Sequence, residues 1–165
     1  MSRSINQFLE QVARRGSWFG GGSVAALSTA LSAALLEKLL AESTLRRELQ
    51  HRRQACVRLI DEDATTFARA IAASRTKTPG RFQRALTQAT RVQVHVAAHA
   101  KAVDAACRRA QRMVKPQLQS DLRCARGLAQ AAAAAAHMLI ETNRAWLRRT
   151  GGGRSSSRRP TRRSA

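Results

Sequence analysis

Apolar residues recur along this chain at spacings of three and four positions, the period of an α-helix with one buried face. The repeat is clearest from Phe82 onward, where it continues for about nine turns until Pro116 stops it. Two segments rich in glycine or proline, 16–23 and 76–80, interrupt the pattern and predict loops. The sequence therefore predicts helices over residues 5–14, 24–43, 45–74, 82 to about 116, and 118–149.

Small side chains are concentrated in two of these predicted helices. The helix over 24–43 combines leucine with alanine and serine, and the last helix contains six consecutive alanines at 131–136. Small side chains favour close contact between helices, whereas the low aromatic content of 4% disfavours a β-sheet. The sequence predicts an all-α fold, a bundle of four to five helices that forms a homodimer through its long helices.

The chain is strongly basic, with 30 Lys and Arg against 10 Asp and Glu and a formal net charge of +20. Residues 150–165 contain no core-forming side chains, so we predict one helical domain at 1–149 followed by a disordered basic tail. A charge of this size exceeds what solubility requires. It predicts unspecific, salt-sensitive binding of nucleic acid or another polyanion, and a non-catalytic protein with that role is the alternative function.

Several classes of protein are excluded by composition and spacing. The three cysteines are far apart in apolar helical stretches, so we expect reduced, packed thiols and no disulfide framework. His95 and His99 are four residues apart, but no carboxylate lies in the same turns, and we predict no metal site. No apolar segment is long enough to export or anchor the chain, which predicts a cytoplasmic protein without membrane contact.

The first candidate site is the segment Gly20-Gly21-Gly22-Ser23, directly ahead of a predicted helix that Ser23 is expected to cap. Consecutive glycines let backbone N–H groups approach a ligand closely, and the start of a helix carries partial positive charge. A carboxylate or phosphate is favoured at such a position. Three glycines before a helix are also common as a simple turn, so the motif alone leaves both interpretations open.

The second candidate site is the acidic cluster Asp61-Glu62-Asp63. Asp63 lies on the same predicted stripe as Ile60 and Phe67, whereas Asp61 and Glu62 point elsewhere. Partial burial raises the pKa of a carboxyl group, which suits Asp63 to act as a general base. The alternative is a structural carboxylate paired with one of the many arginines.

Three polar residues stand out in the last predicted helix. Ser120 and Asp121 lie at its start, where such residues ordinarily cap exposed N–H groups and complement the helix dipole. Asn143 occupies a position on the apolar stripe of the same helix. Its amide therefore needs a partner, either a ligand or a neighbouring helix.

Taken in order, these motifs resemble the cyclodeaminase/cyclohydrolase family. That family includes the C-terminal domain of formiminotransferase-cyclodeaminase and the bacterial methenyltetrahydrofolate cyclohydrolases. The resemblance covers nearly all of residues 5–147. It is carried, in similar order and spacing, by Phe8-Leu9, the Gly20-Gly21-Gly22-Ser23 turn, the stretch from Leu59 to Phe67, Ser120-Asp121-Leu122 and Asn143.

The resemblance implies a folate-dependent one-carbon enzyme that needs no metal or redox cofactor. The implied reaction is cyclisation of 5-formimidoyltetrahydrofolate to 5,10-methenyltetrahydrofolate with loss of ammonia, or hydrolysis of the methenyl form to 10-formyltetrahydrofolate. Asp63 corresponds to the proposed catalytic residue of the family. The substrate is expected to be bound by Gly20, Gly21, Gly22, Ser23, Ser120, Asp121 and Asn143.

Some positions depart from the family pattern. Phe19 replaces the proline that usually precedes the three glycines, and Thr29 and Ser32 replace glycines of the next helix. Leu139 replaces one of two asparagines near the C-terminus. The lost glycines restrict close approach of the backbone, and Leu139 removes a polar group from the expected pocket. The non-catalytic protein on the same scaffold is therefore the alternative.

Overall fold

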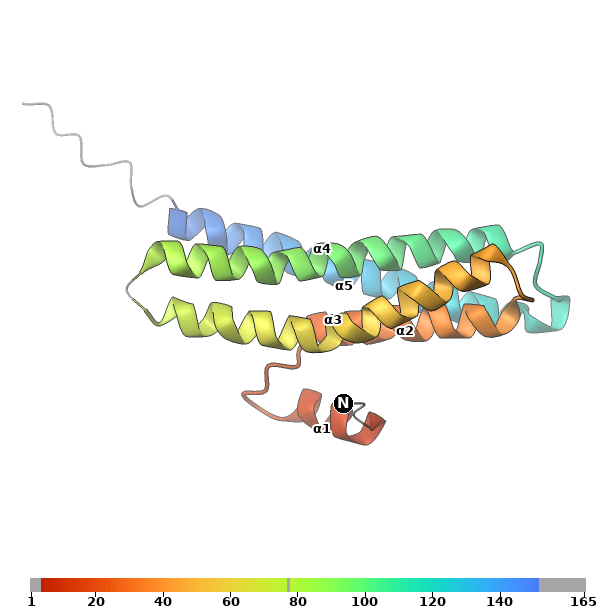
Figure 1. The fold of residues 1–165 in the computed structure, drawn as a ribbon, viewed down its shortest axis with the longest axis horizontal. Helices are drawn as coiled ribbons and strands as arrows, with labels where there is room; N and C mark the ends of the chain where they lie inside the picture. Colours follow the sequence, from red (N-terminus) through yellow and green to blue (C-terminus); the bar gives the residue numbers. More distant parts are fainter. Residues whose placement is uncertain (1–3, 77, 152–165) are drawn as a thin grey trace, which may run out of the picture.

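The computed structural model describes residues 4–76 and 78–151 of the 165-residue chain. The described residues form an all-α fold without strands, which confirms the predicted fold class (Figure 1). The elements are α1 (Ile5–Ala13), α2 (Gly21–Leu39), α3 (Thr44–Ser74), α4 (Pro79–Ala110), the short 3₁₀ helix η1 (Pro116–Leu118) and α5 (Gln119–Gly151).

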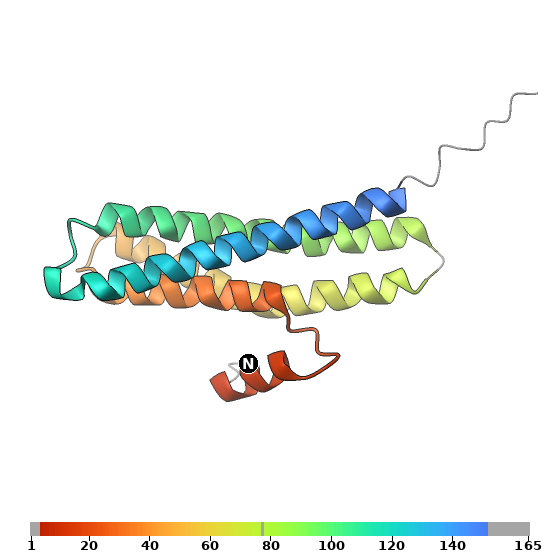
Figure 2. The same cartoon turned by 180° about the vertical axis from the view of Figure 1, so that it is seen from behind.

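Helices α2 to α5 pack along the length of the molecule, and α1 lies outside this group (Figures 1 and 2). Helix α2 contacts both α3 and α5, and α4 packs against the same two helices. Helix α2 has 19 residues and spans about 28 Å at 1.5 Å per residue. The other three have 31, 32 and 33 residues and are roughly 46 to 50 Å long. Helix α2 therefore begins in the middle of the bundle, and one end of the described bundle consists of α3, α4 and α5.

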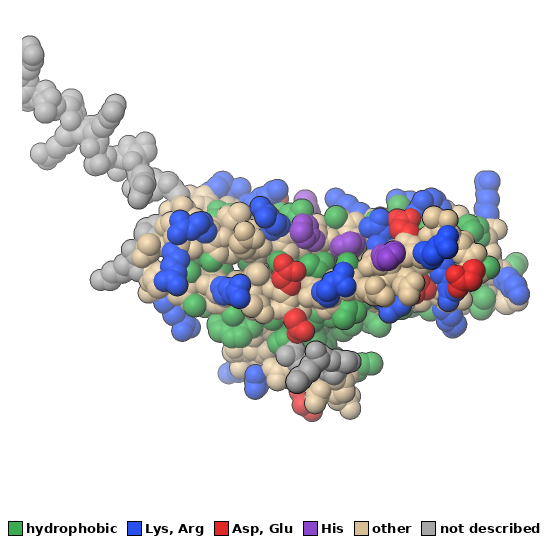
Figure 3. Space-filling view, viewed as in Figure 1, with side chains coloured by type: hydrophobic (Ala, Val, Ile, Leu, Met, Phe, Trp, Pro, Cys, Tyr) green, Lys and Arg blue, Asp and Glu red, His purple; other side chains and the backbone are tan. Residues whose placement is uncertain are grey.

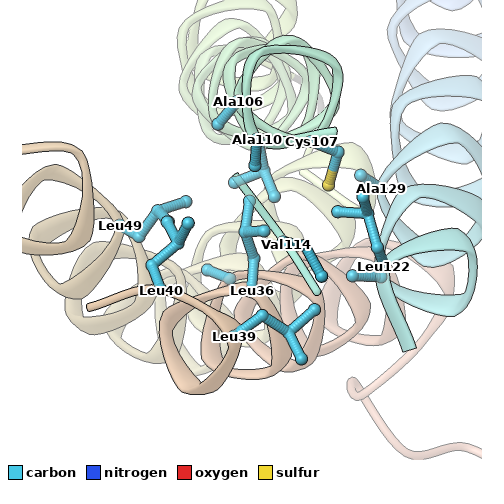
Figure 4. Close-up of a cluster of buried hydrophobic side chains, with 13 residues drawn as sticks. Leu36, Leu39, Leu40, Leu49, Ala106, Cys107, Ala110, Val114, Leu122 and Ala129 are labelled. Atoms are coloured by element: carbon cyan, nitrogen blue, oxygen red, sulfur yellow. The ribbon is translucent and has the colours of Figure 1, made fainter. Parts of the chain in front are cut away.

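The hydrophobic core runs through the bundle in three clusters. At the four-helix end, α2, α3, α4 and α5 all contribute to the cluster, in which Leu36 lies between Leu49 on one side and Leu122 on the other (Figure 4). The middle cluster consists mostly of alanine side chains, which allows the helices to approach closely, as the small-residue stretches predicted. At the three-helix end, the rings of Phe82 and Trp146 pack with centroids 4.9 Å apart and close the core without α2.

Both ends of α2 differ from the sequence prediction. The helix begins at Gly21 with Gly20 as its N-cap, because Ser23 lies inside the first turn and directs its side chain to α3 instead of capping. It ends at Leu39, before the predicted end at residue 43. There Ser43 caps α3 by accepting a hydrogen bond from the N–H of Arg46. At the first boundary the hydroxyl of Ser23 binds Asp63 and does not cap α2. At the second, the hydroxyl of Ser43 caps the start of α3.

The later boundaries also shift by several residues. Helix α4 begins at Pro79, because proline is tolerated in a first turn, where its missing N–H has no helical partner. It ends at Ala110, and η1 begins at Pro116. Helix α5 continues to Gly151, beyond the predicted domain boundary at 149. The rest of the predicted basic tail, 152–165, lies outside the described residues.

Lys and Arg side chains are spread over the face of the bundle seen in Figure 3, with few Asp and Glu between them. Among the described residues, four ion pairs join neighbouring helices: Arg53–Glu37 at 2.8 Å, Arg126–Asp104 at 3.0 Å, Lys38–Asp121 at 3.2 Å and Arg109–Glu48 at 3.5 Å. Because these pairs are partly exposed to water, each contributes about 1 kcal/mol or less. None of the described helices has the length and apolar character needed to cross a bilayer.

The three cysteines lie in two different environments. Cys56 and Cys107 are buried, and burial raises the pKa of their thiols to about 12 and about 11. Cys124 is exposed, which corrects the expectation that all three thiols are packed. Its neighbours Leu122 and Ala125 form the buried stripe of α5, so the side chain of Cys124 falls on the opposite face.

We expect a disulfide reagent to modify one thiol in the native protein and three after denaturation. A thiolate is the reactive form, so burial and a raised pKa protect Cys56 and Cys107 while Cys124 reacts. Absorbance of the released thiol product, with mass spectrometry to locate the modified residue, measures this. Rapid modification of Cys56 in the folded state would contradict the structure.

Candidate functional site

A cleft opens at the point where α2 begins, in the space left by its shorter length. Its walls come from the glycine turn ahead of α2 and from the facing sides of α3, α4 and α5. The cleft has a volume of about 120 Å³, and its lining includes Trp18, Gly21, Gly22, Asp63, Gln93 and Asn143. The structure thus brings the glycine motif, the acidic cluster and the polar residue of α5 to one place.

Gly22 is the residue at which α2 comes closest to the polar groups of α3 and α4. A Cβ atom on Gly22 would overlap Oδ1 of Asp63 and Nε2 of Gln93, and it would lie 2.6 Å from Cγ of Asp63. Atoms this close repel strongly, so any side chain here displaces both residues. Position 22 therefore requires glycine because a side chain would clash with Asp63 and Gln93, and not because the helix backbone requires it.

Asp63 is 7% exposed and is held by neutral donors from two other helices. The hydroxyl of Ser23 in α2 donates to Oδ2 over 2.8 Å. Nε2 of Gln93 in α4 donates to Oδ1 over 2.5 Å. The described residues provide no ion pair between Asp63 and an arginine or lysine, so the structural alternative of a paired carboxylate finds no support there.

Burial raises the pKa of the Asp63 carboxyl above its usual value, because the charged form loses hydration. The hydroxyl and the backbone N–H of Ser23 oppose this shift by donating to the carboxylate, and the amide of Gln93 does the same. The net direction is upward. Asp63 is therefore a carboxylate of increased basicity at the edge of a cleft, which suits it to accept a proton and release it again.

The N-terminus of α2 faces the same cleft. Its N-cap, Gly20, has no side chain, and no side-chain hydrogen bond caps this helix end. The N–H groups of a first helical turn have no partners inside the helix and carry partial positive charge. Gly20 and Gly21 line the cleft, so these N–H groups can donate to an anionic or carbonyl oxygen of a ligand.

Aromatic and apolar side chains form the rest of the wall. Trp18 is 42% exposed and lies beside the cleft together with Phe67 from α3. A flat indole face of this kind can stack on the ring of a ligand. Leu139 closes the opposite side and lies 3.7 Å from the position of a Cβ on Gly21.

Gln93 is a site residue that the sequence analysis missed. It is 3% exposed, and its Oε1 is buried without a hydrogen-bond partner among the residues described. A signal was present in the sequence, because Gln93 lies four residues after Ala89 and four before Ala97, both of which are buried. A glutamine at a buried helical position needs a partner for each of its polar atoms.

Asn143 lies where the sequence analysis placed it, facing inward from α5. It is 8% exposed and lines the cleft one turn after Leu139. The prediction that its amide meets a ligand or a neighbouring helix is consistent with this position.

Ser120 and Asp121 are not brought to the cleft within one chain. Asp121 forms an ion pair with Lys38 at 3.2 Å, and Lys38 lies in the last turn of α2. Lys38 is 16 residues from Gly22, about 24 Å along α2, so Asp121 lies near the far end of α2 from the cleft. Helix α5 begins at the four-helix end of the bundle and reaches the cleft only at Leu139 and Asn143. In this structure Asp121 instead occupies the first turn of α5, where it complements the helix dipole.

The histidines of α4 lie away from the cleft. Nδ1 of the half-buried His99 is 3.5 Å from a guanidinium nitrogen of Arg52. Burial lowers the pKa of His99, and the charge of Arg52 adds to this effect. Within residues 4–76 and 78–151, no group of three or more His, Cys, Asp or Glu side chains is arranged to hold a metal ion.

Comparison with known proteins agrees with the all-α fold. The sequence model of the family described as formiminotransferase-cyclodeaminase matches residues 4–149. The solved structure of formiminotetrahydrofolate cyclodeaminase from Thermotoga maritima has a similar fold, with a TM-score of 0.77 and 20% sequence identity. The match covers 90% of this chain and 86% of that chain. No curated protein matches the sequence. On the family match, which spans almost the whole described chain, this protein belongs to the formiminotransferase-cyclodeaminase family.

Proposed function

We propose that this protein catalyses a proton-transfer reaction on a one-carbon adduct of tetrahydrofolate, as a cyclodeaminase or a methenyltetrahydrofolate cyclohydrolase. The observation that carries the proposal is the buried carboxylate of Asp63, hydrogen-bonded to Ser23 at the start of α2 and facing a cleft. Membership of the family supports a folate as the ligand. The raised pKa of Asp63 supports its role as the base.

Different residues of the cleft lining would contact different parts of such a ligand. Trp18 and Phe67 offer apolar surface to the pterin ring, and the first-turn N–H groups of α2 donate to an oxygen atom of the ligand. Asn143 contributes a further polar contact from α5. A cleft of about 120 Å³ is too small for a whole folate, so we expect the pterin with N5 to enter, N10 to lie at the mouth and the glutamate part to lie outside.

In the cyclodeaminase reaction, N10 attacks the carbon of the protonated formimidoyl group and forms a new C–N bond. The π electrons of the C=N bond move to the terminal nitrogen. Asp63 takes the proton from N10 and returns it to the terminal nitrogen, which leaves as ammonia when its bond to carbon breaks. The positive charge of the substrate remains on the methenyl product, so the step balances. A carboxylate whose pKa is raised both accepts and releases this proton readily.

In the cyclohydrolase reaction, the same carboxylate acts on water. Asp63 takes a proton from a water molecule as its oxygen adds to the methenyl carbon. The remaining O–H proton moves to N5 while the C–N5 bond breaks, which leaves 10-formyltetrahydrofolate. The proton held by Asp63 passes to solvent. Both reactions therefore use Asp63 in one position.

Binding and turnover of a folate test this proposal. We expect saturable heat of binding when a tetrahydrofolate polyglutamate is titrated into the protein. We also expect a change in methenyltetrahydrofolate absorbance with 5-formimidoyltetrahydrofolate or the methenyl form as substrate. The absence of both binding and turnover in correctly folded protein would refute a folate-dependent role.

Replacement of Ser23 by Ala tests the environment of the proposed base. Loss of the hydroxyl removes a donor from the carboxylate, so the pKa of Asp63 should rise further. Because a general base works in its deprotonated form, we expect the acid limb of the pH profile of kcat/KM to move to higher pH. Ser28→Ala, later on the same helix, serves as the matched control. An acid limb that stays in place in Ser23→Ala would argue against Asp63 as the group that titrates.

Dimerisation and polyanion binding stay predictions. Exposed apolar side chains on α2, among them Val24 and Leu31, support contact with a second copy. No acidic residue occurs between Asp63 and Asp104, a stretch that contains several arginines, which supports binding of an anionic polymer. Sedimentation at several protein concentrations measures dimerisation. Binding of duplex DNA at low and high salt measures polyanion binding.

A further inference from the structure

Gln93 places a buried acceptor at the cleft. Its Nε2 is occupied by Asp63, whereas Oε1 has no partner among the described residues. A buried carbonyl oxygen without a donor destabilises the folded state, and such atoms in native proteins require an explanation. Gln93 lines the cleft, so a bound ligand that shifts the side chains covering Oε1 is the explanation that the geometry offers.

The orientation of the Gln93 amide is fixed by Asp63. A carboxylate only accepts hydrogen bonds, so the amide must direct its NH₂ group toward Oδ1. The reverse orientation would place two acceptor oxygens 2.5 Å apart. An ionised Asp63 therefore leaves Oε1 as the atom of Gln93 that is still free to accept, which means that the ligand must supply a donor.

We propose that Oε1 of Gln93 accepts a hydrogen bond from an N–H group at the reacting end of the substrate, and so selects folate adducts that carry one. This inference rests on the proposed function, because it takes the ligand to be a folate. Among the two candidate substrates, 5-formimidoyltetrahydrofolate has N–H groups on N10 and on its one-carbon unit. The 5,10-methenyl form has no hydrogen on N5, N10 or any nitrogen of the bridge.

A role limited to holding Asp63 predicts a different result. If Gln93 only positioned the carboxylate, any preference for a ligand with an N–H would come from Asp63, which takes the N10 proton in the proposed mechanism, and would be lost in Asp63→Ala. If Oε1 contacts the ligand, the preference survives in Asp63→Ala and is lost when the amide of Gln93 is removed. The comparison therefore needs two ligands that differ in this donor and do not react.

Tetrahydrofolate and 5,10-dideazatetrahydrofolate form such a pair, since the second has carbon in place of N5 and N10. We expect calorimetry to show that the wild-type protein binds tetrahydrofolate about tenfold more tightly or better, as one buried hydrogen bond predicts. Gln93→Met, of similar volume but without donor or acceptor, should bind both ligands alike. Gln88→Met, an exposed glutamine on the same helix, is the control and should keep the wild-type preference.

A second variant, Gln93→Glu, tests the inference even if Gln93→Met fails to fold. In Gln93→Glu, two neighbouring carboxyl groups share a proton, so the introduced carboxylic acid donates to Asp63 and its other oxygen still accepts. We expect this variant to retain the preference for tetrahydrofolate. Equal weakening of both ligands in Gln93→Met, or loss of the preference in Asp63→Ala or in folded Gln93→Glu, would overturn the inference and leave the proposed function intact. Binding of neither ligand to the wild-type protein would overturn the proposed function itself.

Discussion

Asp63→Asn is expected to lower turnover of the folate adduct by about 10²- to 10⁴-fold, the usual contribution of a positioned general base. Asparagine has nearly the same shape, and its oxygen still accepts a hydrogen bond from Ser23, but it takes up no proton. Initial rates of methenyltetrahydrofolate formation or loss measure the effect. Glu62→Gln is the matched control, because Glu62 is exposed on the same turn of α3 and should keep the wild-type rate. Equal rates in wild type and Asp63→Asn would remove Asp63 from the mechanism.

The same substitution should stabilise the folded protein at neutral pH. The pKa of Asp63 is raised in the folded state, so its contribution to stability is fully present below the unfolded pKa and is lost as the pH rises through the folded pKa. At pH 7, well above the unfolded pKa, this contribution is reduced or lost, because the folded state resists the ionisation that the unfolded chain allows, and asparagine removes the ionisable group. We expect a higher Tm for Asp63→Asn at pH 7 and a smaller difference below the usual pKa of aspartate. A lower Tm at both pH values would contradict this account.

Gly22→Ala is expected to destabilise the protein by about 1–3 kcal/mol, as overpacking of a tight core does. In an open helix alanine is the better helix former, yet here its Cβ would overlap Asp63 and Gln93. These side chains are buried, so they must move apart and give up the hydrogen bond between them. We therefore expect loss of folate turnover as well, measured together with chemical unfolding.

Gly127→Ala provides the control for the loss of a helical glycine. Gly127 lies within α5, is exposed, and has no atom within 4 Å of the position that a Cβ would take. This substitution should stabilise the protein by roughly 0.4–1 kcal/mol, because alanine restricts the unfolded chain. If Gly22→Ala behaved like Gly127→Ala, the close contact of Gly22 with the polar site would be refuted.

The sequence predicted the helices and the inward position of Asp63 because both depend on local spacing. Apolar residues at three and four positions place Ile60, Asp63 and Phe67 on one face of α3 whatever the neighbouring helices do. The start of α2 depends on tertiary contacts instead. Ser23 is a good N-cap by type, but a carboxylate from α3 binds its hydroxyl, and the helix extends back to Gly21.

Which of the other candidate residues belong to the site could not be predicted from the sequence, because spacing along a helix does not show which end of that helix lies at the cleft. Ser120, Asp121 and Asn143 all belong to α5, and spacing along a helix does not show which of them lies beside the glycine turn. The direction in which α5 packs decides this, and it brings Asn143 to Gly22 while Asp121 pairs with Lys38. Gln93 was overlooked because a single glutamine in a long apolar repeat resembles a surface position until the burial of its neighbours is known.

Because α2 is short, the local stability of the helices around the cleft should depend on whether a ligand is bound there. The half of the molecule that contains the cleft lacks the layer which a longer α2 would supply, so we expect its helices to open locally at a lower free energy than those of the other half. A bound pterin would fill part of the missing layer and add its binding free energy to the stability of these helices. The substrate would then act as a structural component as well as a reactant, tightening the walls of its own site.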